Sequence, residues 1–179
     1  MNIFVFLSRI LKCIYGYEAI NILFRISPSF IKIKILRQYG AKIGDNVRIL
    51  NPFMIHNADE NESIYLNLKI GDNCFIGRDC IFDLKETIEI GNNVTISHRV
   101  VLNTHTNAGN SPISKTKLAE TTGGIKINDG AYIGSNVTIL ESVIIGYNTI
   151  IGASSLLNKN IPDGVTAFGV PCKIKGLSK

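Results

Sequence analysis

The chain has 179 residues, of which 45% are hydrophobic and 18% are charged, and its formal net charge is +5. This length suits a single domain with its own core, and the composition excludes an intrinsically disordered chain. No uncharged run reaches the length of a membrane-spanning helix, and the first charges follow the first apolar stretch, so we expect neither a transmembrane anchor nor a secretory signal.

Residues 1–40 place apolar side chains at helix-like intervals, and this spacing predicts one or two amphipathic helices, broken near Ser27–Pro28. The first fifty residues carry eight Lys or Arg against two acidic residues. Such a basic field attracts phosphates, but no nucleic-acid-binding motif accompanies it, so nucleic acid ranks last among the partners. Residues 1–26 could form a helix that lies on an anionic bilayer, or helices that pack against the solenoid or a neighbouring subunit.

Residues 43–157 repeat with a period of six. An aliphatic or aromatic residue recurs at every sixth position, with a two-residue slip near 88 and a break after 102, at Ile43, Ile49, Ile55, Ile70, Ile76, Phe82, Ile88, Ile90, Ile96, Leu102, Ile127, Ile133, Ile139, Ile145, Ile151 and Leu157. Gly often follows this residue, Asn or Asp comes two positions later, and then a small or β-branched residue. A period of six with these residue types excludes a helix and predicts a short strand and a sharp corner in each hexad.

Three hexads make one triangular coil, so residues 41–160 are predicted to form an all-β solenoid, a parallel β-helix that buries the repeated aliphatic residue. The polar segment 107–124 interrupts the coil, and long excursions from rigid scaffolds often carry function. Residues 161–179 form a short C-terminal extension. Cys74 and Cys80 occupy equivalent repeat positions and are interpreted as small core residues of a chain in a reducing, cytoplasmic setting.

The motifs IGDNCFIGRDC, IGNNVTISHRVVLNTHT and IGASSLLNKNIPDG followed by GVPCKI resemble the hexapeptide-repeat acyltransferases. The ending is similar to the branch that includes the capsule, lipopolysaccharide and maltose O-acetyltransferases. The resemblance implies a left-handed β-helix, a homotrimer, and acetyl-CoA bound in the groove between two solenoids. It also implies a histidine at the subunit interface that activates a hydroxyl of a sugar or cell-envelope glycan.

The catalytic candidate is His105, in the sequence Leu-Asn-Thr-His-Thr. It occupies a corner of the solenoid directly before segment 107–124, where a base beside a lid could remove a hydroxyl proton without a metal. The resemblance places the histidine either at His105 or two residues later, where this chain has Asn107. Family members often carry Asp after the histidine, whereas this chain has Thr106. The sequence therefore does not identify the group that orients the imidazole of His105. His98, at another corner, is a candidate for acceptor binding together with Asn107.

Side chains that match coenzyme A contacts of the family are Tyr132, Ser135, Ala153, Asn158, Lys159 and Lys173. Lys159 and Lys173 suit the coenzyme phosphates, although both are also ordinary surface residues. Two other functions stay open at this point. One is a metalloenzyme resembling the γ-type carbonic anhydrases, which also carry few histidines on a trimeric solenoid, although the seven-residue spacing of His98 and His105 differs from the spacing in that family. The other is a non-catalytic solenoid that serves assembly.

Overall fold

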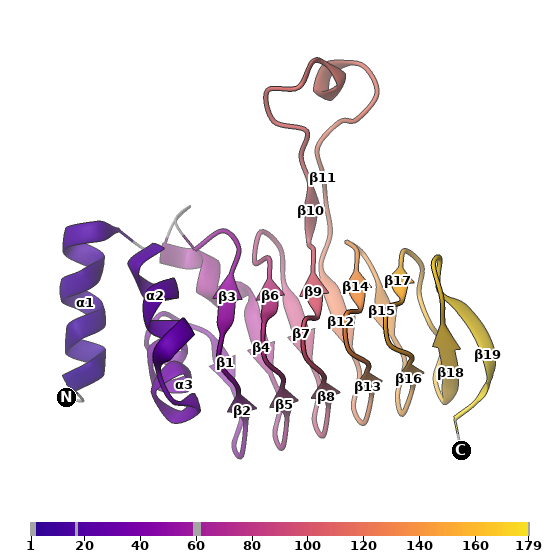
Figure 1. Ribbon diagram of the computed structural model, residues 1–179, viewed down its shortest axis with the longest axis horizontal. Helices are drawn as coiled ribbons and strands as arrows, with labels where there is room; N and C mark the ends of the chain where they lie inside the picture. The colour runs from indigo at the N-terminus through magenta and orange to yellow at the C-terminus, as the bar shows by residue number, and fades with distance from the viewer. Residues whose placement is uncertain (1–2, 17, 59–61, 179) are drawn as a thin grey trace.

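A computed structural model describes residues 3–16, 18–58 and 62–178. The chain forms an elongated solenoid with helices at its N-terminal end, two longer strands at its C-terminal end, and one arm that stands away from its side (Figure 1). The solenoid is a left-handed parallel β-helix, as the resemblance implies. Among the described residues, every helix falls short of the length and apolar character needed to cross a membrane.

The N-terminal segment contains three helices, not the one or two that the sequence predicts: α1 (Ile3–Tyr15), α2 (Glu18–Ile26) and α3 (Ser29–Gln38). The expected break at Ser27–Pro28 is confirmed, because α2 ends before it and α3 begins after it. The second break lies near Gly16, which has a φ of 72°. Helices α2 and α3 pack on the first strands, and α1 packs on α2 and α3.

The solenoid has three sheets, one on each side of the triangular coil, and their strands are short and parallel except for the last, β19, which pairs antiparallel with β18. Sheet 1 contains β1 (Lys42–Ile43), β4 (Leu68–Ile70), β7 (Ile88–Ile90), β12 (Ile125–Ile127) and β15 (Ile144–Ile145). Sheet 2 contains β2 (Arg48–Ile49), β5 (Phe75–Ile76), β8 (Thr95–Ile96), β13 (Tyr132–Ile133), β16 (Ile150–Ile151), β18 (Val165–Phe168) and β19 (Lys173–Leu177). Sheet 3 contains β3 (Phe53–Ile55), β6 (Cys80–Phe82), β9 (Val101–Leu102), β14 (Thr138–Ile139) and β17 (Leu156–Leu157).

The repeated aliphatic residues fill the inside of the coils, as the period predicts. In sheet 2, Ile76 pairs with Ile96, Ile96 with Ile133, and Ile133 with Ile151, and all four are fully buried. Like residues therefore stack along the axis, which gives each side chain the same neighbours above and below. At the two-residue slip, β7 buries both Ile88 and Ile90.

The corners use the residue types that the sequence supplies. Asn or Asp at the predicted turn position has a positive φ between 52° and 58° at Asn46, Asn73, Asp79, Asn93, Asn136 and Asn148. The small residue that follows is buried, and Cys74 and Cys80 are free thiols at this position. Burial raises the pKa of the Cys80 thiol to about 11, so Cys80 serves packing and not redox chemistry.

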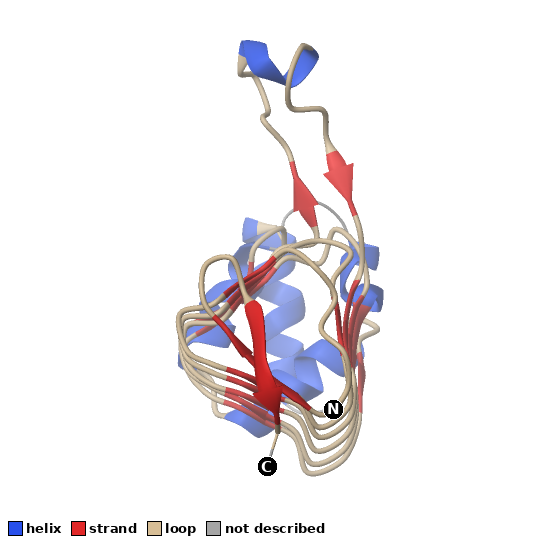
Figure 2. Cartoon of the chain, turned by 90° about the vertical axis from the view of Figure 1, so that its right-hand side faces the viewer, coloured by secondary structure: helices blue, strands red, loops and turns tan. Residues whose placement is uncertain are grey.

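The arm leaves the solenoid after β9. It rises through β10 (His105–Thr106), contains the short helix η2 (Pro112–Lys115), and returns through β11 (Thr121–Thr122), with His105 opposite Thr122. The view along the solenoid shows the arm extending outward (Figure 2). The sequence predicts the interruption, but the segment extends away from the corner instead of closing over it as a lid. A second short helix, η1 (Glu62–Asn67), precedes β4.

Candidate functional site

The corner between sheets 3 and 1 brings Asp83 and His105 together from consecutive coils. Strands β6 and β9 are neighbours in sheet 3, with Phe82 opposite Leu102. Asp83 follows β6 directly, and His105 begins β10 at the base of the arm. The Oδ2 atom of Asp83 lies 2.6 Å from Nδ1 of His105. The stacking of the coils therefore creates a carboxylate–imidazole pair that no local motif contains.

Hydrogen bonds hold the Asp83 carboxylate in place. Its Oδ2 accepts from the backbone N–H groups of Thr104, at 2.8 Å, and His105, at 3.0 Å, and its Oδ1 accepts from the N–H of Lys85 at 3.1 Å. The Thr104 hydroxyl donates to the backbone carbonyl of Asp83 at 2.9 Å. The side chain of Asp83 is 2% exposed, so this network takes the place of solvent around the charge.

The charge state of Asp83 follows from these contacts. Burial alone would raise the pKa of its carboxyl, but the hydrogen bonds from His105, Lys85 and Thr104 outweigh burial and lower the pKa below its ordinary value. An ionised carboxylate has no proton to donate, so Nδ1 of His105 carries the shared proton. This tautomer leaves Nε2 with a free lone pair on a side chain that is 18% exposed.

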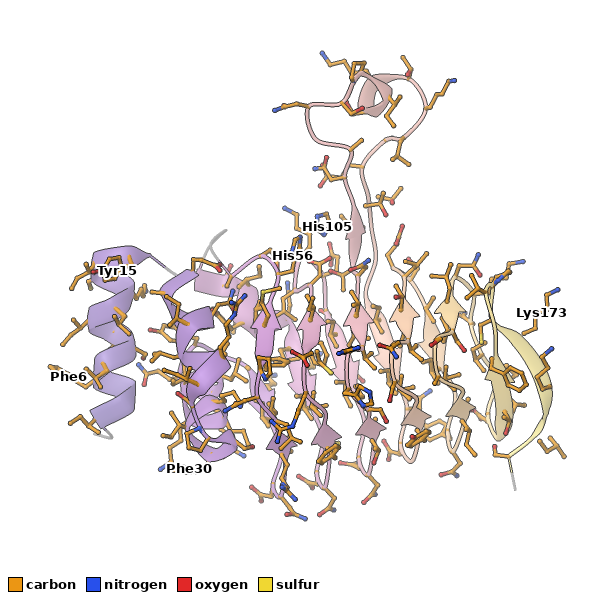
Figure 3. All side chains as sticks on the ribbon, viewed as in Figure 1. Phe6, Tyr15, Phe30, His56, His105 and Lys173 are labelled. Atoms are coloured by element: carbon orange, nitrogen blue, oxygen red, sulfur yellow. The ribbon has the colours of Figure 1, made fainter. Side chains whose placement is uncertain are left out.

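A second histidine, His56, lies against His105. It follows β3 on the coil before Asp83, and the two imidazole rings stack with centroids 6.2 Å apart and planes 27° from parallel. The stick view shows both rings at the base of the arm (Figure 3). The sequence gives little reason to single out His56, because it lies where the hexad phase slips.

The arm is attached to the same corner by Glu141. This residue follows β14 on the next coil, and its Oε1 accepts from the hydroxyl of Thr121 at 2.9 Å and that of Thr106 at 3.4 Å. Both strands of the arm are thereby tied to the solenoid beside His105. Asn107 is exposed, and its Oδ1 accepts from the backbone N–H of Gly109 at 2.6 Å, so this side chain folds into the arm.

His98 lies at a different corner, between sheets 2 and 3. Its Nδ1 is 3.0 Å from the Ser135 hydroxyl, and on the adjacent face the Ser97 hydroxyl donates to the Tyr132 phenol at 3.2 Å. A cavity of about 250 Å³ beside this cluster is lined by Leu50, Phe75, Gly77, Arg78, Ser97 and His98. Its lining combines an apolar floor with the cation of Arg78, which suits an elongated ligand with a charged group.

The remaining candidates for coenzyme contact are spread along the later coils. Ala153 is exposed at the corner between sheets 2 and 3, one coil beyond Ser135, and the N–H of its neighbour Ser154 bonds to the Ser135 carbonyl at 2.8 Å. Asn158 and Lys159 are exposed after β17 at the corner between sheets 3 and 1, and Lys173 begins β19 at the end of the solenoid (Figure 3).

Within one chain, therefore, the structure groups the candidates by corner. His105 and Asn107 share one corner, while Tyr132, Ser135, Ala153 and His98 lie along another. The described residues contain no group of three or more His, Cys, Asp or Glu side chains that could hold a metal ion.

Two models of repeat families match the chain. The model described as bacterial transferase hexapeptide (six repeats) matches residues 124–159, and the hexapeptide repeat of succinyl-transferase matches residues 67–103. These segments are the regular coils on either side of the arm.

Curated relatives and a solved structure extend this similarity. A putative acetyltransferase of Saccharomyces cerevisiae is 32% identical over 80% of this chain and 69% of its own length. The galactoside O-acetyltransferase of Lactococcus lactis is 31% identical over 80% of this chain, which spans 66% of that enzyme. The Vibrio cholerae hexapeptide-repeat acetyltransferase complexed with acetyl coenzyme A has the same fold, with a TM-score of 0.77 at 21% identity over 96% of this chain and 89% of its own.

Proposed function

This chain belongs to the hexapeptide-repeat acyltransferases, and from that premise we propose that it transfers an acetyl group from acetyl-CoA to a hydroxyl of a sugar or cell-envelope glycan. The observation that carries the proposal is the Asp83–His105 pair, which leaves Nε2 of His105 ready to accept a proton.

The reaction is a direct transfer in which His105 acts as general base. Its Nε2 takes the proton from the acceptor hydroxyl, and the acceptor oxygen attacks the thioester carbonyl. The carbon–sulfur bond breaks, and the imidazolium of His105 returns the proton to the departing thiolate, which leaves an acetyl ester and a free thiol. Asp83 fixes the tautomer and stabilises the imidazolium while it exists, without itself taking the proton.

Acetyl-CoA supplies the activated acetyl group, and exposed side chains of the later coils would hold it. Tyr132, Ser135 and Ala153 would line its path, and Lys159 and Lys173 would pair with its phosphates. The small side chain of Ala153 keeps that corner open. One relative is a galactoside O-acetyltransferase, which supports a sugar as the acceptor.

The active site would be complete only in a homotrimer. His105 lies at the corner between sheets 3 and 1, and Ser135 and Ala153 lie at the corner between sheets 2 and 3 with Tyr132 beside them on sheet 2. A groove between two solenoids would bring the base of one subunit to the donor residues of its neighbour. Mixing tests this arrangement. His105→Ala and Ala153→Trp should each be inactive alone, and heterotrimers refolded from both should recover activity, because some grooves then carry neither substitution.

The N-terminal helix supports peripheral contact with an anionic membrane. Five apolar side chains on α1 are exposed along an arc of about 100°: Ile3, Phe6, Leu7, Ile10 and Ile14. The opposite side of the helix buries Ser8, so α1 turns its apolar stripe away from the protein. The helix also contains Arg9 and Lys12 and no acidic residue. Co-sedimentation with anionic vesicles should decrease when residues 1–26 are removed, and unchanged co-sedimentation would contradict this contact.

The enzyme activity itself is tested by product identification. Purified protein is incubated with acetyl-CoA and a panel of sugars, nucleotide sugars and envelope glycans, and thiol release is followed together with mass spectrometry of the sugar. We expect thiol release that depends on the acceptor and an acetylated product. Absence of turnover together with absence of coenzyme A binding would instead favour a solenoid that serves assembly.

A further inference from the structure

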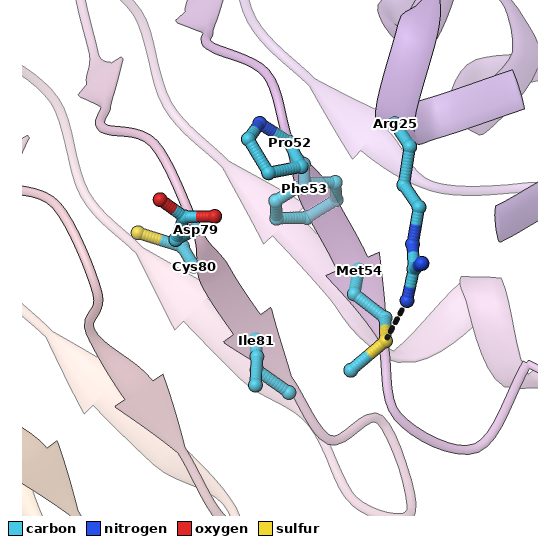
Figure 4. Close-up of a pocket in the computed structure, with 7 residues that line it drawn as sticks. All are labelled: Arg25, Pro52, Phe53, Met54, Asp79, Cys80 and Ile81. Atoms are coloured by element: carbon cyan, nitrogen blue, oxygen red, sulfur yellow. Dashed lines mark hydrogen bonds between the residues drawn. The ribbon is translucent and has the colours of Figure 1, made fainter. Parts of the chain in front are cut away.

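A cavity of about 350 Å³ lies between α2 and the outer face of sheet 3. It is lined by Arg25, Pro52, Phe53, Met54, Asp79, Cys80 and Ile81, and the close-up shows the Arg25 side chain descending from α2 onto Met54 (Figure 4). Met54 and Ile81 are the outward-facing residues of β3 and β6. The cavity therefore joins an apolar floor to one guanidinium group, a combination typical of sites for small charged ligands.

The position of Arg25 is fixed by the turn of α2 that precedes it. The side chain of Asn21 accepts from the backbone N–H of Ile55 at 2.9 Å and donates to the carbonyl of the same residue at 2.8 Å. Asn21 is buried, and Arg25 lies four residues later on the same face of the helix. The paired bonds at Ile55 thus anchor α2 to the end of β3 and hold Arg25 above the middle of that strand.

The charge of Arg25 has no carboxylate partner among the described residues. Its Nη2 lies 3.6 Å from the sulfur of Met54, and a thioether sulfur is a weak acceptor. Asp79 lines the same cavity but lies across it from the guanidinium (Figure 4). Asp79 precedes β6 and therefore lies at the end of the cavity away from Asp83, so the guanidinium is available to an anionic group of a ligand that extends toward His105.

The two strands that floor the cavity lead to the catalytic corner. Strand β3 ends one residue before His56, and β6 ends one residue before Asp83. At about 3.3 Å per residue, Met54 lies roughly 7 Å along the strand from His56, whose ring stacks on His105. The cavity and the proposed catalytic corner therefore lie along the same two strands, with His56 between Met54 and His105.

From this geometry we infer that the cavity at Arg25 is an acceptor subsite for an anionic group, a phosphate or a carboxylate, of a sugar whose hydroxyl His105 activates. The inference rests on the proposed acetyl transfer and narrows its substrate class to anionic sugars. Phosphate and carboxylate can each present a pair of oxygens to a guanidinium. The structure therefore assigns a negative charge to the acceptor, and the test distinguishes a phosphate from a carboxylate.

The test compares four galactose derivatives as acceptors: neutral methyl β-galactoside, galacturonic acid, galactose 1-phosphate and UDP-galactose. Wild type, Arg25→Gln, Arg25→Lys and the charge-matched control Lys34→Gln, on the exposed side of α3, are assayed by thiol release. We expect Arg25→Gln to raise KM about tenfold or more for at least one anionic acceptor, with KM for the neutral galactoside unchanged. Arg25→Lys should recover part of the loss, and Lys34→Gln should behave as wild type.

Calorimetric titration with galactose 1-phosphate and galacturonic acid provides a readout without turnover. Binding by wild type that Arg25→Gln weakens supports the subsite even if no acceptor is acetylated, in which case the proposed activity alone is wrong. Acetyl transfer that Arg25→Gln leaves unchanged for every anionic acceptor overturns the subsite while the activity stands. Absence of binding and of any preference for anionic acceptors in the wild type also overturns it.

Discussion

Asp83 and His105 are separated by 22 residues in the sequence, yet Oδ2 of the first lies 2.6 Å from Nδ1 of the second. The pair exists because one coil of the solenoid places each residue over its counterpart in the coil before. An aspartate that is 2% exposed and bonded to three backbone N–H groups is rigid, so it presents a fixed oxygen to the imidazole.

Asp83→Asn should lower kcat by roughly 10²-fold or more, because the amide N–H₂ can donate to Nδ1 and stabilise the wrong tautomer of His105. The measurement is the initial rate of thiol release at saturating acetyl-CoA. Asp45→Asn is the control, since the Asp45 side chain is 98% exposed and should not affect the rate. A rate for Asp83→Asn within threefold of wild type, in a folded trimer, would show that Asp83 does not orient the base.

The lowered pKa of Asp83 also allows us to predict how the free energy of unfolding depends on pH. Its pKa in the folded protein is lowered from 3.8, so the carboxylate stabilises the folded state above that value, and the contribution is lost as pH falls through the folded pKa. The difference in unfolding free energy between wild type and Asp83→Asn should therefore be constant near neutral pH and shrink below about pH 4. Urea denaturation across this range measures it, and a difference that grows toward low pH would reverse the assigned sign.

His56→Ala should lower kcat/KM by about threefold to tenfold, the range expected from one aromatic contact. His56→Phe keeps a ring against His105 and should retain most of the activity, which separates stacking from proton transfer. If His56→Phe loses as much activity as His105→Ala, His56 takes part in the proton transfer and does not act through ring stacking alone.

The burial of Lys32, at the junction of the helices with the solenoid, leads us to expect a second dependence of folding stability on pH. Lys32 is fully buried, and its ammonium donates to the Ser27 carbonyl at 3.0 Å and to the Asn51 side chain. Burial, together with the nearby charge of Arg78, lowers the pKa of Lys32 from 10.5 to about 8. Between these two values the unfolded chain binds more protons than the folded one, so stability rises with pH. Wild type should gain stability relative to Lys32→Met between pH 8 and 10.5, by up to about 1.4 kcal/mol per pH unit. A flat difference in urea denaturation would contradict this.

Much of the fold follows from the period of six. The series from Ile127 to Leu157 keeps its phase, and each of its members is fully buried. The left-handed turn at Asn136, with a φ of 58°, likewise follows from the residue type. The helices are less predictable, because their apolar faces indicate amphipathic character but not the break near Gly16.

The proposed catalytic corner, where Asp83 and His105 meet, can be predicted only in part. His105 has a recognisable position beside the arm, but Asp83 and His56 both lie where insertions shift the hexad phase, so counting by six does not show that they meet. Arg25 depends on how α2 docks, and that is decided by the bonds between Asn21 and Ile55. Such contacts between distant segments leave no periodic trace in the sequence.

The central claim is that His105 is the base of an acetyl transfer. Its most direct test is the rate of acceptor-dependent thiol release from acetyl-CoA by wild type and by His105→Ala, with trimer assembly and melting temperature checked for both. The account predicts turnover by wild type with at least one sugar acceptor and a loss of roughly 10²-fold or more in the variant. A folded His105→Ala variant that keeps nearly the wild-type rate would contradict it and make His98 the next candidate.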